Sequence, residues 1–154
     1  EGRALSFEDF WIQEKPQRLR GKDRELSSVM LGDLEIRLFR TMHIPDSSKS
    51  WEGSFPSYGL LLDRRVLFTA DTRYDPELIL SMDAEYPLDT IFHDVQFFTG
   101  GVHASLDEIK ELPASIKAKT LLMHYGDKGM ESLDKVKEAG FAGMEEQWKT
   151  YRFA

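Results

Sequence analysis

The stretch LEIRLFRTMH, residues 34–43, indicates most clearly how this chain folds. Apolar side chains at positions 34, 36, 38 and 42 alternate with polar ones at 35, 37 and 41, the period-two pattern of a half-buried strand. The predicted strand ends on His43. A polar residue at the end of a strand is well placed for a functional site, so the stretch predicts both a strand and a candidate functional residue.

Further strands and helices alternate along the rest of the chain. Hydrophobic runs predict strands at residues 58–62, 66–69, 90–95 and 120–123. The turn between the first two of these strands is expected at residues 63–65. Capping residues predict helices that begin at Pro76, after Ser105 and at Ser132. This order predicts a layered α/β (α+β) fold with polar residues where the strands end.

The composition limits the chemistry of the chain. Its 154 residues are 41% hydrophobic and 31% charged, as expected for a single soluble domain. The absence of cysteine excludes disulfides and thiol nucleophiles and leaves histidine and carboxylates as strong metal ligands. A net charge of −7 argues against a broad nucleic-acid-binding surface. The sequence has no membrane-spanning run and no secretory pattern at its start, so we expect a cytoplasmic protein without membrane contact.

The histidines are concentrated on predicted strands and near strand ends. They are His43, His93, His103 and His124. Asp71 lies between a predicted strand and a predicted helix, and its carboxylate can bridge two ions. Imidazoles together with a carboxylate are typical ligands of divalent transition metals. The alternative for any single histidine is a hydrogen-bonded structural residue, and we expect that role for His93, packed inward.

Six short pieces of the sequence occur in an order and spacing that match a known fold family. They are HIPD at 43–46, YGLLL at 58–62, FTADT at 68–72, FHD at 92–94, HAS at 103–105 and LMHY at 122–125. In these pieces the chain resembles the C-terminal half of the metallo-β-lactamase fold, most closely its ribonuclease Z and phosphodiesterase branch. The resemblance implies that residues 34–154 form that half of an αββα sandwich. Residues 1–33 are then an N-terminal segment of uncertain structure, with packing on a missing N-terminal half as one alternative.

The resemblance also implies a set of site residues. It implies that His43, Asp71 and His124 are metal ligands, with Asp71 as the bridge between two divalent ions. Zinc is the first choice of metal, and manganese and iron are alternatives. The resemblance further implies that Asp94 orients His103, which would donate a proton to a leaving oxygen.

The chain departs from the family pattern in two places. Ala70 stands where the family usually has glycine before Asp71, so the turn is either less tight or uses a backbone region allowed for alanine. The family's second metal-binding cluster, His-x-His-x-Asp-His, is absent from the chain. We therefore expect an N-terminal half or a partner chain to supply those ligands, with association of identical chains as an alternative.

The resemblance implies a metal-dependent hydrolase. The first interpretation is a phosphodiesterase or nuclease that acts on a nucleotide or RNA through a metal-activated hydroxide. The second is a lactone or thioester hydrolase that uses the same hydroxide. The third is a non-catalytic domain that binds a metal for sensing, and the missing ligand cluster favours it.

Overall fold

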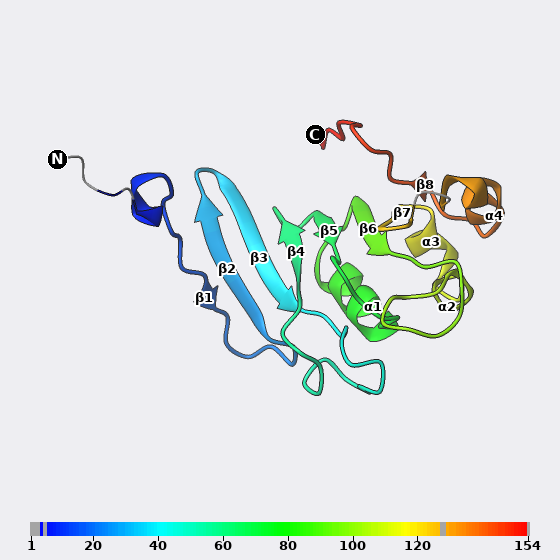
Figure 1. Ribbon diagram of the computed structural model, residues 1–154, viewed down its shortest axis with the longest axis horizontal. Helices are drawn as coiled ribbons and strands as arrows, with labels where there is room; N and C mark the ends of the chain where they lie inside the picture. Colours follow the sequence, from blue (N-terminus) through cyan, green and yellow to red (C-terminus); the bar gives the residue numbers. More distant parts are fainter. Residues whose placement is uncertain (1–3, 5, 127–128, 154) are drawn as a thin grey trace.

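An eight-stranded β-sheet organises the described part of the chain in the computed structural model, which covers residue 4, residues 6–126 and residues 129–153 (Figure 1). The strands are β1 (Gln17–Arg18), β2 (Leu26–Leu31), β3 (Leu34–Arg40), β4 (Tyr58–Leu62), β5 (Val66–Phe68), β6 (Thr90–Asp94), β7 (Thr120–Met123) and β8 (Gly143–Met144). They lie in the sheet in the order of the sequence. Neighbouring strands are antiparallel from β1 to β5 and parallel from β5 to β8.

The antiparallel half of the sheet contains two tight turns. β2 and β3 are joined at a turn in which Gly32 has a φ of 62°. The predicted hairpin between β4 and β5 is confirmed, and Asp63 and Arg64 form its turn with φ values of 47° and 57°. β1 and β2 belong to residues 1–33, and β2 pairs with β3, so this part of the N-terminal segment lies in the same sheet. The domain boundary after residue 33 stays a prediction.

Helices connect the strands of the parallel half. They are α1 (Pro76–Glu85), α2 (Leu106–Ile109), α3 (Ala114–Lys117) and α4 (Leu133–Glu138). The short 3-10 helix η2 (Gly129–Ser132) leads directly into α4, and a second one, η1 (Phe7–Asp9), precedes β1. α1 begins as predicted, because the Asp75 side chain accepts a hydrogen bond of 3.1 Å from the backbone N–H of Leu78. Ser105 and Glu108 form the predicted capping box at the start of α2.

The main hydrophobic core lies between the sheet and these helices. Fully buried strand residues that contribute to it include Leu61, Leu67, Ile91 and Leu122. Fully buried helix residues include Leu78, Ile79, Ile109 and Val136. Each such side chain stabilises the fold by roughly 1.5–3 kcal/mol relative to an exposed one, so this layer fixes the helices on the sheet.

The opposite side of the sheet, which we call the open face, is also apolar. Residues paired in register point to the same side of a sheet, and this rule defines the members of the open face. Its apolar members are Val29, Leu31, Leu34, Ile36, Leu38, Leu60, Leu62, Val66, Phe68, Phe92, Leu121 and Met123. Tyr151 packs edge-on against Phe92, with ring centroids 5.3 Å apart, and covers one end of this face. Phe68 remains 37% exposed, so the cover is incomplete.

The predicted α/β layering is confirmed in its coarse form, a mixed α/β fold with one sheet and few helices in the described residues. A complete αββα sandwich of the metallo-β-lactamase kind is not shown. No helix within the described ranges is long and apolar enough to cross a membrane.

Candidate metal centre

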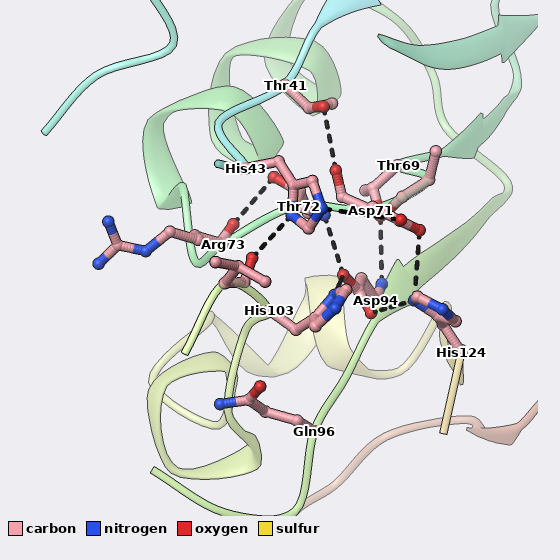
Figure 2. A network of polar contacts seen from close by, with 12 residues as sticks. Thr41, His43, Thr69, Asp71, Thr72, Arg73, Asp94, Gln96, His103 and His124 are labelled. Carbon is pink, nitrogen blue, oxygen red and sulfur yellow. Dashed lines mark hydrogen bonds and ion pairs between the residues drawn. The ribbon is translucent and has the colours of Figure 1, made fainter. Parts of the chain in front are cut away.

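The C-terminal ends of four strands meet at one edge of the sheet. β3 and β5 are both antiparallel to β4, and β5, β6 and β7 are parallel, so β3, β5, β6 and β7 run in the same direction. In open α/β sheets, this edge is where ligands bind. His43, Asp71, Asp94 and His124 lie at these strand ends, and the loop after β6 brings His103 beside them (Figure 2).

Asp94, the last residue of β6, has a completely buried side chain. Its Oδ2 accepts a hydrogen bond of 2.9 Å from the backbone N–H of Thr72 and lies 2.6 Å from His103 Nδ1. Its Oδ1 lies 3.2 Å from His124 Nδ1. A buried carboxylate is costly unless several donors surround it, and here one backbone amide and two imidazoles do so. The predicted pairing of Asp94 with His103 is therefore present, and the acid–base role of the pair stays a prediction.

Asp71 lies in the turn after β5 and has a half-exposed side chain. Its Oδ1 lies 3.2 Å from His124 Nδ1, and its Oδ2 lies 3.8 Å from His43 Nε2. Ala70, just before it, has a φ of 51°, in the left-handed region that favours glycine. The turn is therefore made with Ala70 itself in the small left-handed region that is open to alanine. The hydroxyl of Thr41 donates a hydrogen bond of 3.1 Å to the backbone carbonyl of Asp71.

His43 is oriented by a backbone carbonyl. Its side chain is 14% exposed, and its Nδ1 lies 3.0 Å from the oxygen of Val102. A carbonyl only accepts hydrogen bonds, so Nδ1 carries a hydrogen, and in the neutral ring the lone pair is then on Nε2. That lone pair is on the nitrogen nearest Asp71, which is the arrangement that a metal ligand requires.

His124 has left-handed backbone geometry, with a φ of 62°, immediately after β7. Its Nδ1 faces both carboxylates at 3.2 Å, one oxygen from Asp71 and one from Asp94. Its ring lies 4.8 Å from that of His103, whose ring lies 5.0 Å from that of His43. The structure thus brings together all five predicted site residues.

Within the described residues, one group of three side chains has its possible ligand atoms close enough together to bind one metal ion. One ligand atom each from Asp94, His103 and His124 lies within 4.8 Å of the others. The predicted ligand His124 belongs to this group, whereas Asp94 was predicted only as the partner of His103. The signal for Asp94 in the sequence was a carboxylate at the end of a buried strand. Metal binding by the predicted ligands stays a prediction.

His93 does not take part in this cluster. It is 1% exposed, and its Nδ1 lies 2.7 Å from the carbonyl oxygen of Asp94. Burial lowers the pKa of the His93 imidazole, because the charged form loses its hydration. The predicted inward packing of His93 is confirmed.

Two residues near the site were not predicted from the sequence. Thr72 supplies the backbone donor to Asp94, and Gln96 is a buried amide in the loop between Asp94 and His103 (Figure 2). A threonine or a glutamine in a loop gives no signal of such a role in the sequence, because the role depends on the path of the backbone. Gln96 also lines a cavity of about 560 Å³, together with Phe97, Phe98, His103, His124 and Tyr125.

Comparison with known proteins finds relatives that share one name. A family model described as Anti-Pycsar protein Apyc1 matches residues 1–151. The Anti-Pycsar protein Apyc1 of Paenibacillus harenae is 45% identical over 95 residues, which cover 61% of this chain and 36% of that protein. That of Bacillus phage vB_BsuM-Goe3 is 35% identical over 151 residues, which cover 92% of this chain and 53% of that protein. The chain therefore spans between about a third and about half of the length of these relatives.

These matches correct the family and the activity predicted from the sequence. The metallo-β-lactamase assignment is wrong, because the matching family and the relatives carry the name Anti-Pycsar protein Apyc1. The predicted metal-dependent hydrolase, whether phosphodiesterase, nuclease or lactone or thioester hydrolase, is overturned by the same finding, since that name describes action against Pycsar. The physical reason is that polar residues at the ends of aligned strands accompany many functions, so their order does not determine one activity.

Proposed function

Because this chain belongs to the Anti-Pycsar Apyc1 family, we propose that it is the metal-binding part of a protein that acts against Pycsar, in an anti-defence role. The name of its relatives supports the role, and the cluster of carboxylates and imidazoles supports the metal. Of the interpretations drawn from the sequence, the non-catalytic metal-binding domain agrees with this proposal, although only loosely.

The surroundings of His124 Nδ1 carry the metal part of the proposal. One oxygen of Asp71 and one of Asp94 each lie 3.2 Å from this nitrogen. A single ring hydrogen cannot be directed at both oxygens, and two carboxylates this close to one point repel each other. A divalent cation among them would interact favourably with both oxygens and with an imidazole lone pair.

We propose that Asp71, Asp94, His103 and His124 hold one or two divalent ions, with His43 beside them as a further ligand. Zinc, manganese and iron all accept imidazole and carboxylate ligands. Of the three, zinc stays the first choice. A bound ion would supply a concentrated positive charge that attracts an anionic ligand. Binding of a nucleotide or RNA, which the sequence led us to expect, stays a prediction.

The proposal includes a partner for the open face. Twelve apolar side chains on one side of a sheet normally pack against another layer, because water would otherwise cover them. We propose that an N-terminal half or a partner chain lays a second sheet there, which gives a two-sheet sandwich, and brings the predicted His-x-His-x-Asp-His cluster to the site. Relatives at least about twice as long as the matched region support this partner. A cytoplasmic location belongs to the same proposal.

The test measures metal binding by the full-length protein that contains this chain. After removal of metal with a chelator, Zn²⁺ is titrated calorimetrically into the parent, Asp94→Asn and His124→Ala. Asp107→Asn is the matched control, because Asp107 is 69% exposed and its carboxylate pairs with Lys110 on the surface of the protein. We expect Zn²⁺ affinity to fall at least about tenfold in the first two variants and to stay unchanged in the control.

A second measurement connects the metal to the role. Each variant is produced in cells that carry Pycsar, and its action against Pycsar is compared with that of the parent. Loss of this action together with Zn²⁺ affinity supports the proposal. If Asp94→Asn and His124→Ala bind Zn²⁺ as the parent does, the proposed metal site is wrong. If they lose Zn²⁺ binding but keep full action against Pycsar, the metal is not needed for that action.

A further inference from the structure

Gln96 closes the loop that leads from Asp94 to His103. Its backbone N–H donates a hydrogen bond of 2.8 Å to the carbonyl of Ala104, and its carbonyl accepts one of 3.0 Å from the backbone N–H of Leu106. These two bonds form a bridge across the base of the loop. Residues 97–103 therefore form a loop whose two ends are fixed beside each other. The shape of the loop then depends on the contacts made in its interior.

The Gln96 side chain lies inside this loop. The residue is 7% exposed, and its Nε2 donates hydrogen bonds to two carbonyls, that of Phe98 at 3.0 Å and that of Gly100. Gly101 has a φ of 105°, and a Cβ at this position would lie 3.3 Å from Gln96 Oε1. The side-chain amide of Gln96 thus donates to two backbone carbonyls of the loop and packs closely against Gly101, where the chain turns back.

The far side of the loop orients two imidazoles of the candidate centre. The carbonyl of Val102 accepts the hydrogen bond from His43 Nδ1 at 3.0 Å. The next residue, His103, directs its own Nδ1 at Asp94 Oδ2 at 2.6 Å. Both rings are thereby held with Nδ1 toward an acceptor and with Nε2 available. Figure 2 shows Gln96 below His103, on the side of the cluster away from Asp71.

We propose that Gln96 is a positioning residue, whose amide holds residues 97–103 in the shape that fixes the orientation and tautomer of His43 and His103. This inference rests on the proposed function, because the orientation matters only if these imidazoles serve a metal site. The partners of ligand side chains commonly change metal affinity about 10- to 100-fold when they are removed, and Gln96 acts one step further out, on two ligands together.

The experiment reads the tautomers directly in the metal-free full-length protein. Long-range ¹H–¹⁵N correlation spectra distinguish protonated from unprotonated ring nitrogens. For the parent we expect single tautomers of His43 and His103 with the hydrogen on Nδ1. Gln96→Glu keeps the size of the side chain and loses both donors, and Gln96→Asn keeps the amide but is too short to reach both carbonyls. Both variants are expected to give mixed tautomers at His43 and His103.

Two controls separate positioning from general damage to the fold. The signals of buried His93 should stay unchanged in both variants, because its partner is the backbone of β6. Gln17→Glu makes the same charge change at an exposed position on β1 and should leave all histidines as in the parent. A Zn²⁺ titration of the Gln96 variants is expected to show an affinity about 10- to 100-fold lower than that of the parent.

The outcomes are distinguishable from those of the proposed function. Parent-like tautomers at His43 and His103 in folded Gln96→Asn would overturn the positioning role, whatever the metal does. Mixed tautomers in a protein whose parent form binds no Zn²⁺ would support the positioning role and count against the metal site. If Gln96→Glu does not fold, Gln96→Asn decides the question alone.

Discussion

At the scale of single residues, the burial of Asp94 is explained by its neighbours. The carboxylate has no exposed surface, and the removal of such a charge from water costs several kcal/mol unless donors replace the water. The Thr72 backbone and the imidazoles of His103 and His124 do so at 2.9, 2.6 and 3.2 Å. The stability of the metal-free protein should therefore depend on these imidazoles.

His103→Ala is expected to lower the free energy of unfolding of the metal-free protein by about 1–3 kcal/mol, because it leaves a buried acceptor without its shortest partner. Urea unfolding in the presence of a chelator measures this change. Addition of Asp94→Asn removes the charge that lost its partner, so the double variant should be less destabilised than the sum of the single variants. Simple additivity would show that the two side chains do not interact.

The sequence predicted which residues meet, but not all of their contacts. His43, Asp71 and His124 could be recognised because each follows a predicted strand. The double contact of Asp94 with two histidines could not be predicted, because it depends on the register in which Asp94 lies beside Met123. The role of Gln96 depends on the path of a loop for which the sequence gives no pattern.

At the scale of elements, β4 passes unusually close to its neighbours at Gly59. A Cβ at this position would overlap the ring of Phe39 and lie 2.8 Å from the carbonyl oxygen of Phe68. Gly59→Ala is therefore expected to destabilise the protein by about 1–3 kcal/mol through overpacking. Gly53→Ala is the control, since its Cβ would meet no atom closer than 3.8 Å. Thermal unfolding compares the two, and equal midpoints would contradict the close approach.

β3 contributes a pH-dependent term to stability through Glu35. The hydrogen bond of 2.8 Å from Arg37 Nε holds the pKa of Glu35 below its ordinary value. A lowered pKa in the folded state stabilises the fold above the pKa of the unfolded chain, and this stabilisation is lost as the pH falls through the folded pKa.

Glu35→Gln is accordingly expected to lower the free energy of unfolding at neutral pH and to make little difference in acid, below the folded pKa. Urea unfolding of parent and variant across that pH range measures the difference. Glu111→Gln, at an exposed position, serves as the control and should leave the pH dependence unchanged. A difference that is the same at every pH would contradict the role of the Glu35 charge.

The sequence was less informative about short elements than about long ones. The helix expected after Ser105 was predicted to run through Ile109 and Leu112 and to stop at Pro113. α2 ends earlier, at Ile109, and a second short helix, α3, follows Pro113. Neither short helix has enough residues to show a helical period. β2, with the sequence LSSVML, has no clean alternation of polar and apolar residues and was not predicted. Its place in the sheet follows from a hairpin with β3, closed by the tight turn at Gly32.

At the scale of the whole molecule, the open face is the feature for which we propose a partner. Phe68→Asp would place a charge among paired apolar residues of β4 and β6. In the full-length protein we expect it to reduce soluble yield and the unfolding midpoint, because a charge buried without a partner is strongly unfavourable. Phe55→Asp is the matched control, since Phe55 is 67% exposed in a loop. Equal behaviour of the two variants would show that nothing packs on this face.

The candidate ligands come one at a time from segments that lie between positions 43 and 124. An ion held by them would join the ends of several strands, as a crosslink does. Each stretch of backbone between two ligands would then be a closed loop. Its binding free energy would then add to the cooperativity of unfolding. A cut in any one of these loops should loosen the ion and the sheet edge together, so resistance to proteolysis would report on occupancy.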